Sequence, residues 1–191
     1  MNHTNHCKLC ENELVNLKNG LICKVTNKKP NFKNTCSEIK LENKFQETLA
    51  LINLKFERIR KKKKTVHVYF YITISIGSVL IISGFSFINT AITSMYALQV
   101  CLGGLAVGIT FLGIGYKKLH EFRKAYYNSV LDKIEIDEVL EKYKIEYQSN
   151  IEFKPNYHGT QEVVVLLKFK NRIKEYSITK HENKYSIIEI V

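Results

Sequence analysis

Four cysteines near the start of the chain are the residues best suited to chemistry. Cys7, Cys10, Cys23 and Cys36 give the spacing C-x2-C-x12-C-x12-C. Zinc prefers four soft ligands in a tetrahedron, and two thiolates two residues apart can turn around one ion. The first pair is therefore a strong metal signal, whereas the other two cysteines need the intervening loop to bring them together. The spacing predicts a structural zinc site in a module at residues 1–38.

The ligand set has an alternative, because His3 and His6 lie close enough in sequence to replace one cysteine. Four protein ligands leave no open position for water, so a structural role is favoured over a catalytic one. In a cytoplasmic segment disulfides are disfavoured, and a metal is the natural way to stabilise so short a stretch. The fifth cysteine, Cys101, lies in an apolar run and is interpreted as a small packing residue.

The same N-terminal residues carry a resemblance. CKLC at residues 7–10, GLICKVTNKKPNF at residues 20–32 and then Cys36 are similar to a short four-cysteine, zinc-ribbon-like module. That module precedes otherwise unrelated membrane domains in assorted bacterial membrane proteins. The resemblance implies a small metal-stabilised cytoplasmic cap and carries no activity.

The charge map identifies the element to which this module is attached. Residues 65–116 hold no Lys, Arg, Asp or Glu, although the chain has 29 basic and 18 acidic residues. Two apolar runs, 66–88 and 95–116, are each long enough, at about 1.5 Å per residue, to cross a hydrocarbon core about 30 Å thick. The stretch therefore predicts an α-helical hairpin of two transmembrane helices.

Small residues form a stripe in each predicted span. The first stripe contains Gly77 and Gly84, and the second contains Ala97, Cys101, Gly104, Gly108 and Gly115. Such residues let transmembrane helices approach closely. The stripes fit packing between the two spans or, alternatively, packing between protomers.

Basic residues on both sides of the hairpin set its orientation. They are Arg58, Arg60 and residues 61–64 before the first span, and Lys117, Lys118, Arg123 and Lys124 after the second. By the positive-inside rule, both termini should be cytoplasmic in a multi-pass protein of the inner membrane. The basic run also suits contact with anionic lipid, and nucleic acid is the alternative partner.

Residues 39–64 predict a basic amphipathic linker helix that continues into the first span. Phe45, Leu49, Ile52, Phe56 and Ile59 recur at intervals of four and three, as in a coiled-coil seam. The seam covers only two heptads. It fits packing against the helix that follows the second span, with self-association as the alternative.

After the second span, residues 117–147 predict cytoplasmic helices. The exit helix should extend to about Lys133, and a second short helix should follow it. An acidic patch lies where the two helices meet, and it consists of Asp132, Glu135, Asp137, Glu138 and Glu141. Residues 148–191 change to alternation with turns and predict an antiparallel β-meander of three strands, with a possible fourth at residues 151–154. The short helix is the nearest cover for this sheet, which gives a small α+β domain.

Enzyme signatures are missing from the sequence. No glycine-rich phosphate loop, nucleophile elbow or paired-histidine metal helix is present, and His158 in a predicted loop has no nearby nucleophile. We therefore expect no enzyme.

Two functions remain open. The first is a protein that self-associates and perturbs or regulates the inner membrane. The second is a membrane anchor or adaptor that binds a cytoplasmic protein or RNA through its basic module and C-terminal domain. The layout of a two-span anchor with small cytoplasmic domains is similar to that of membrane accessory and effector proteins of bacterial antiphage systems, which implies a role in antiviral defence.

Overall fold

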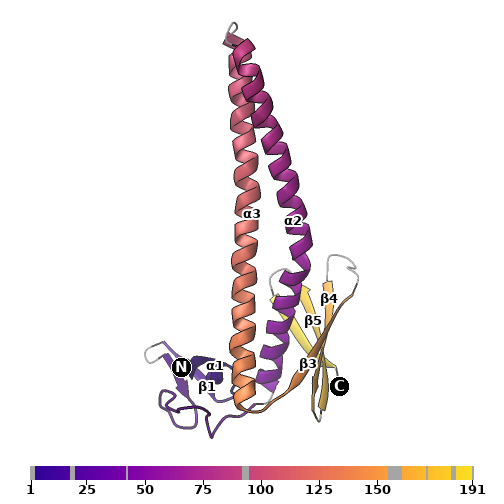
Figure 1. Cartoon of the computed structure of the whole chain (residues 1–191). Coiled ribbons are helices and arrows are strands. Elements are labelled where there is room, and N and C mark those ends of the chain that lie inside the picture. Colours follow the sequence, from indigo (N-terminus) through magenta and orange to yellow (C-terminus); the bar gives the residue numbers. More distant parts are fainter. Residues whose placement is uncertain are drawn as a thin grey trace. The chain divides into compact units, whose positions relative to one another are not determined.

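The computed structural model describes residues 3–17, 20–41, 43–91, 95–154, 161–170, 172–181 and 184–190. Its elements, in chain order, are α1 (His3–Lys8), β1 (Glu13–Asn16), β2 (Gly20–Cys23), α2 (Asn43–Ala91), α3 (Met95–Lys142), β3 (Tyr147–Phe153), β4 (Gln161–Phe169), β5 (Arg172–His181) and β6 (Lys184–Ile190) (Figure 1). They form two compact units. The first unit contains Met1–Glu57 and Ser129–Val191, and the second contains Arg58–Asn128.

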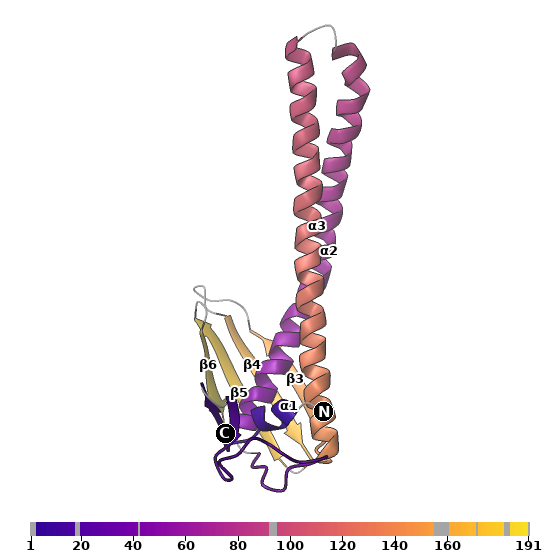
Figure 2. The same ribbon diagram turned by 90° about the vertical axis from the view of Figure 1, so that its left-hand side faces the viewer.

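The second unit is an antiparallel pair of helical segments, one from α2 and one from α3, that lie side by side in both views (Figures 1 and 2). Both helices are long and apolar enough to cross a membrane, as the charge-free stretch predicts. Only 17% and 6% of their most apolar windows are buried, which distinguishes them from the core helices of a soluble domain. Large apolar side chains such as Val79, Phe85 and Val100 are exposed along the pair.

Glycines allow the two segments to approach closely. A β-carbon on Gly77 would lie 2.9 Å from the backbone oxygen of Gly108, and one on Gly84 would lie 2.9 Å from Cδ2 of Leu105. A methyl group on Gly115 would collide with the hydroxyl of Thr73. For these glycines, packing between the two helices is confirmed.

Gly104 does not share this role. A β-carbon built there meets no heavy atom within 4 Å, and the same is true of Gly103 and Gly113. The predicted stripe on the second span therefore divides into glycines that pack against α2 and a glycine that faces open space.

The first unit has one core, to which both ends of the chain contribute. Leu9 from the segment after α1, Phe45 and Leu49 from α2, Leu140 from α3 and Val165 from β4 are all buried together. Burial of Phe45 and Leu49 against α3 residues confirms that the linker seam packs on the helix that follows the second span. The N-terminal module and the C-terminal sheet therefore share a core.

The first turn of α2 is held by the N-terminal module. The backbone N–H of Lys44 donates to the Glu11 carboxylate at 2.8 Å, and the Lys44 ammonium pairs with Glu13. A carboxylate at a helix N-terminus satisfies a free N–H and complements the helix dipole. These contacts therefore cap the first turn of α2, which begins at Asn43.

The C-terminal sheet has four antiparallel strands in the order β3-β4-β5-β6. Val165 on the central strand β4 lies opposite Ile151 on β3 and Tyr176 on β5. Val163, Val165 and Leu167 alternate along β4 and are fully buried in the core. The meander is thus longer than predicted, because β3 begins at Tyr147 and makes the possible fourth strand a full member.

The predicted break in α3 is wrong. The helix continues past Lys133 to Lys142, so the exit helix and the acidic short helix are one element. No glycine or proline interrupts residues 117–142, and Ile136, Val139 and Leu140 keep a helical face buried in the core. The helix ends where Lys144 adopts a left-handed backbone (φ 55°) and Ile145 N–H donates to the Leu140 carbonyl at 3.0 Å.

Candidate metal centre

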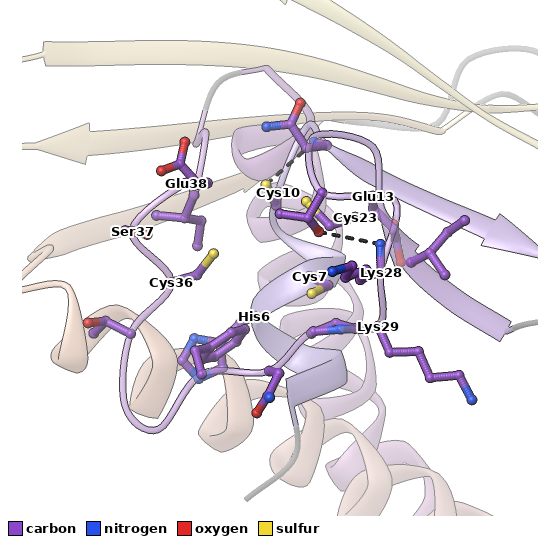
Figure 3. A pocket seen from close by; sticks show the side chains of 18 residues that line it. His6, Cys7, Cys10, Glu13, Cys23, Lys28, Lys29, Cys36, Ser37 and Glu38 are labelled. Atoms are coloured by element: carbon purple, nitrogen blue, oxygen red, sulfur yellow. Dashed lines mark hydrogen bonds between the residues drawn. The ribbon is translucent and has the colours of Figure 1, made fainter.

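The four predicted metal ligands line one cavity. Cys7, Cys10, Cys23 and Cys36 all border a cavity of about 330 Å³ in the first unit, together with His6 (Figure 3). Cys7 lies in the last turn of α1, Cys23 ends β2, and Cys36 lies in the irregular segment before α2. Residues that are far apart in sequence thus line the same cavity.

Cys10 accepts hydrogen bonds from the backbone. The N–H groups of Asn12 and Lys40 each point to its Sγ atom at 3.4 Å. The turn before it is closed by the N–H of Cys10 and the Cys7 carbonyl at 3.0 Å. Amide donors stabilise a thiolate more than a neutral thiol, because they offset its negative charge. This environment suits a cysteine that acts as a metal ligand.

Cys23 has a similar environment in a second turn. The pKa of its thiol is lowered, chiefly because the backbone N–H of Thr26 donates to it and, to a smaller extent, because that of Val25 does. The turn is closed by the N–H of Asn27 and the Cys23 carbonyl at 2.8 Å, with Asn27 in a left-handed conformation (φ 51°). Asparagine tolerates this conformation better than most residues.

Cys7 shows the opposite effect. Burial raises the pKa of its thiol to about 11, and the neighbouring charges of Cys10, Cys36 and Cys23 raise it further. Burial and neighbouring negative charge thus disfavour the thiolate form of Cys7, and a cation beside it would favour that form. The arrangement of donors therefore fits a soft divalent metal ion.

Tyr143 links this centre to the end of α3. Its hydroxyl accepts the backbone N–H of Cys36 at 2.8 Å and lies 3.2 Å from Nδ1 of His6. His6 is only 5% exposed, and its ring packs edge-on against Phe32 and Tyr143. His6 is therefore a buried residue at the wall of the cavity, and its Nδ1 atom has the Tyr143 hydroxyl as a partner. Burial also raises the pKa of Tyr143.

The four thiols line one cavity, but they do not form a metal-binding group. Among the described residues, no group of three or more His, Cys, Asp and Glu side chains is close enough to hold a metal ion. The described cysteines are all free thiols. The predicted four-cysteine metal module is therefore not seen as a formed metal-binding group in this part of the chain, and zinc binding stays a prediction. The side chain of His3 lies outside those that the structure describes, as does the whole of His158.

A second polar cluster was not predicted. Asn53, only 2% exposed, accepts from Lys133 Nζ at 2.6 Å and from Ser149 Oγ at 3.2 Å, and its amide donates to the Leu49 carbonyl at 2.9 Å. The Tyr147 hydroxyl donates to the Asp137 carboxylate at 2.7 Å and accepts a hydrogen bond from Lys133 Nζ at 3.3 Å. These side chains form hydrogen bonds with one another. The cluster therefore connects α2, α3 and β3, and we assign it a structural role. We call it the Asn53 network.

The other predicted residues have ordinary surroundings. Asp132 in the acidic patch pairs with Lys55 at 2.6 Å on the surface, and Asp137 belongs to the Asn53 network. The backbone oxygen of Cys101 lies 3.6 Å from the position of a β-carbon on Gly84, so Cys101 lies at the contact between the two helices. His67 and His120 contact the rings of Phe122 and Tyr116.

Comparison with models of protein families, with curated proteins and with solved structures finds no match for this chain.

Proposed function

We propose that this chain is a non-enzymatic two-span protein of the bacterial inner membrane, which self-associates and perturbs or regulates that membrane. The observation that carries the proposal is the helix pair, which has no charge over residues 65–116 and exposes large apolar side chains along both helices. In water such a surface is unfavourable, whereas lipid covers it fully.

The first unit supports an even number of spans. Its core joins Leu9, which precedes both helices, with Val165, which follows both. Residues that share one core must lie on one side of a membrane. Together with the basic residues that flank the uncharged stretch, this supports cytoplasmic positions for both ends of the chain.

The donors of the cysteine cavity support structural zinc. Cys7, Cys10, Cys23 and Cys36 would hold the ion, which supplies a charge-neutralising crosslink between α1, β2 and the segment before α2. A module with so few buried residues needs such a crosslink. The backbone N–H groups directed at Cys10 and Cys23 would remain in place as donors to bound thiolates.

The metal proposal is tested by zinc analysis of the full chain, purified in detergent under reducing conditions. We expect one zinc per chain and its loss in Cys10→Ser. Cys101→Ser is the matched control, because that cysteine lies in α3 away from the cavity. A wild-type chain without stoichiometric zinc would contradict the proposal.

Self-association is supported by a line of exposed polar and small residues on α3. Gln99, Gly103, Ala106, Thr110 and Gly113 follow intervals of four and three, and all are exposed. We call this line the outer seam. It places an amide side chain in the apolar span, where a partner helix offers it a hydrogen bond. Gly103 and Gly113 leave open space beside it.

Crosslinking of the full chain in native membranes tests self-association. We expect a defined homo-oligomer that is lost in the double variant Gly103→Leu/Gly113→Leu. Gly104→Leu is the matched control, since Gly104 also faces open space but lies about 100° around the helix from Gly103. Retention of the oligomer in the double variant would refute the outer seam as the interface.

The adaptor function is the second candidate. It is favoured by Lys24, Lys28, Lys29 and Lys33, which are exposed on the N-terminal module and suit an acidic protein or RNA. A monomer that crosslinks only to a soluble partner would favour it over self-association. A role in antiviral defence stays a prediction from the layout of the chain.

A further inference from the structure

Basic residues are concentrated at one end of the second unit. Arg58–Asn128 contains ten Lys and Arg residues and a single acidic residue, Glu121. Nine of the ten are exposed, namely Arg60, Lys61, Lys62, Lys63, Lys64, Lys117, Lys118, Arg123 and Lys124. We call these nine residues the basic collar.

The two halves of the collar adjoin each other along the helix pair, with Lys117 and Lys118 nearer to the apolar stretch than residues 61–64. Lys118 Nζ from α3 lies 4.6 Å from the centre of the Tyr69 ring of α2, and the rings of His67 and Phe122 are 6.1 Å apart. Because the helices are antiparallel, residues 61–64 lie beside the turns of α3 that follow Phe122. The charges of both helices therefore gather where the uncharged stretch ends.

Aromatic rings flank the collar on its apolar side. The Lys118 ammonium lies over the Tyr69 ring, and the Tyr116 ring stacks on that of His120 with ring centres 6.2 Å apart. Tyrosines prefer the level of the lipid headgroups, where one end of the ring is apolar and the other meets water. Along the helix pair, apolar surface is followed by aromatic rings and then by cations. A phospholipid leaflet has its layers in the same order.

We propose that the basic collar binds the headgroups of anionic phospholipids and so gives the helix pair a preference for them. This inference rests on the proposed insertion of the helix pair in a membrane. Anionic phospholipid is the partner because its phosphate charge complements a patch with nine exposed cations, and because its position in the leaflet follows from the adjoining apolar span. Lysines also reach headgroups readily, since their flexible stems lie along apolar surface.

Lipid binding is measured with the full chain in nanodiscs that contain phosphatidylcholine and spin-labelled phosphatidylglycerol, against nanodiscs with spin-labelled phosphatidylcholine. We expect the protein to immobilise the anionic label preferentially. Lys61→Gln/Lys62→Gln/Lys63→Gln/Lys64→Gln should reduce this preference at least about fivefold, because each surface cation contributes to attraction. Nanodiscs make the result independent of the orientation of the hairpin.

The matched control removes the same charge elsewhere. Lys24→Gln/Lys28→Gln/Lys29→Gln/Lys33→Gln neutralises four exposed lysines of the N-terminal module and should leave the lipid preference unchanged. An equal loss in both variants, or equal immobilisation of the two labels by the wild type, would overturn the inference. So would a collar variant that loses RNA binding while its lipid preference is kept.

Failure of the inference and failure of the proposed function look different. A wild-type chain that enters nanodiscs but immobilises both labels equally contradicts the collar alone. A wild-type chain that stays in aqueous buffer without detergent contradicts membrane insertion, and with it the collar.

Discussion

At the scale of single residues, the cysteines of the candidate site were predictable from the sequence, but the groups that surround them were not. The four cysteines stand out by their spacing, and the structure brings them to one cavity. Tyr143, which bonds to Cys36 and His6, carries no such signal because one aromatic residue after a helix has many possible roles. Asn53 lies next to the apolar seam, and only the positions of Lys133 and Tyr147 explain its burial.

Tyr147 gives a pH-dependent prediction. Burial, followed by its hydrogen bond to Asp137, raises the pKa of the Tyr147 hydroxyl above its usual value near 10. The folded state therefore favours the neutral phenol. The contribution of Tyr147 to stability is constant below about pH 10 and is lost as the pH rises towards the folded-state pKa. We expect the stability of the first unit to fall above about pH 10.

Chemical unfolding of the full chain in micelles across this pH range measures the effect. Tyr147→Phe should weaken the alkaline loss of stability and should cost about 1–3 kcal/mol at neutral pH, because Asn53, Lys133 and Asp137 lose a partner. The exposed Tyr127 is the control residue, and Tyr127→Phe should keep the wild-type pH profile. A Tyr147→Phe profile identical to wild type would contradict the assignment.

At the scale of elements, periodicity and charge were sufficient for the long helices. The uncharged stretch fixes the two apolar helices, and the linker seam places Phe45 and Leu49 against α3. The length of α3 was underestimated, because its acidic residues look like a separate surface helix while Ile136, Val139 and Leu140 keep it in the core. Which glycines pack between the helices also depends on the register of α2 against α3, which no single stripe specifies.

Gly115 provides the test of that register. A methyl group there meets the Thr73 hydroxyl, which already donates to the backbone oxygens of Tyr69 and Phe70. We expect Gly115→Ala to destabilise the helix pair by about 1–3 kcal/mol, as overpacking does. Thermal unfolding in micelles measures the change.

Two further variants make this result specific. Gly103→Ala should be close to neutral, since a β-carbon at Gly103 meets open space. Thr73→Ala in the Gly115→Ala background should restore much of the lost stability, because it removes the hydroxyl. Equal effects of the two glycine substitutions would show that the register is different.

At the scale of the whole molecule, the sequence suggested separate N-terminal and C-terminal parts, and the structure unites them in the first unit. Leu9, Phe45, Leu140 and Val165 belong to one core. Long-range pairing of this kind leaves no local pattern, because each partner has the apolar periodicity of its own element only. The two apolar helices were predictable from composition, but the shared core was not.

Leu167 tests this union, because it lies on β4 and is fully buried in the shared core. Leu167→Ala should leave a cavity and cost about 2–5 kcal/mol. We expect trypsin to cut the lysine-rich segment at Lys24 and Lys28 faster in this variant, although the substitution is in the C-terminal sheet. Leu131→Ala, at a more exposed leucine of α3, should leave the rate of cleavage unchanged. An unaltered rate in Leu167→Ala would indicate two independent folding units.

The joint core also dictates an order of events during synthesis. When the ribosome has made Leu9, Phe45 and Leu49, the residues of β4 that cover them are not yet translated. The hydrophobic hairpin emerges in between, so under the proposed insertion in a membrane it would reach the translocon before the N-terminal residues can bury their apolar side chains. The nascent N-terminal segment would therefore remain incompletely folded until the last strands are translated. An ion bound early by its cysteines would protect it from aggregation and proteolysis during this time.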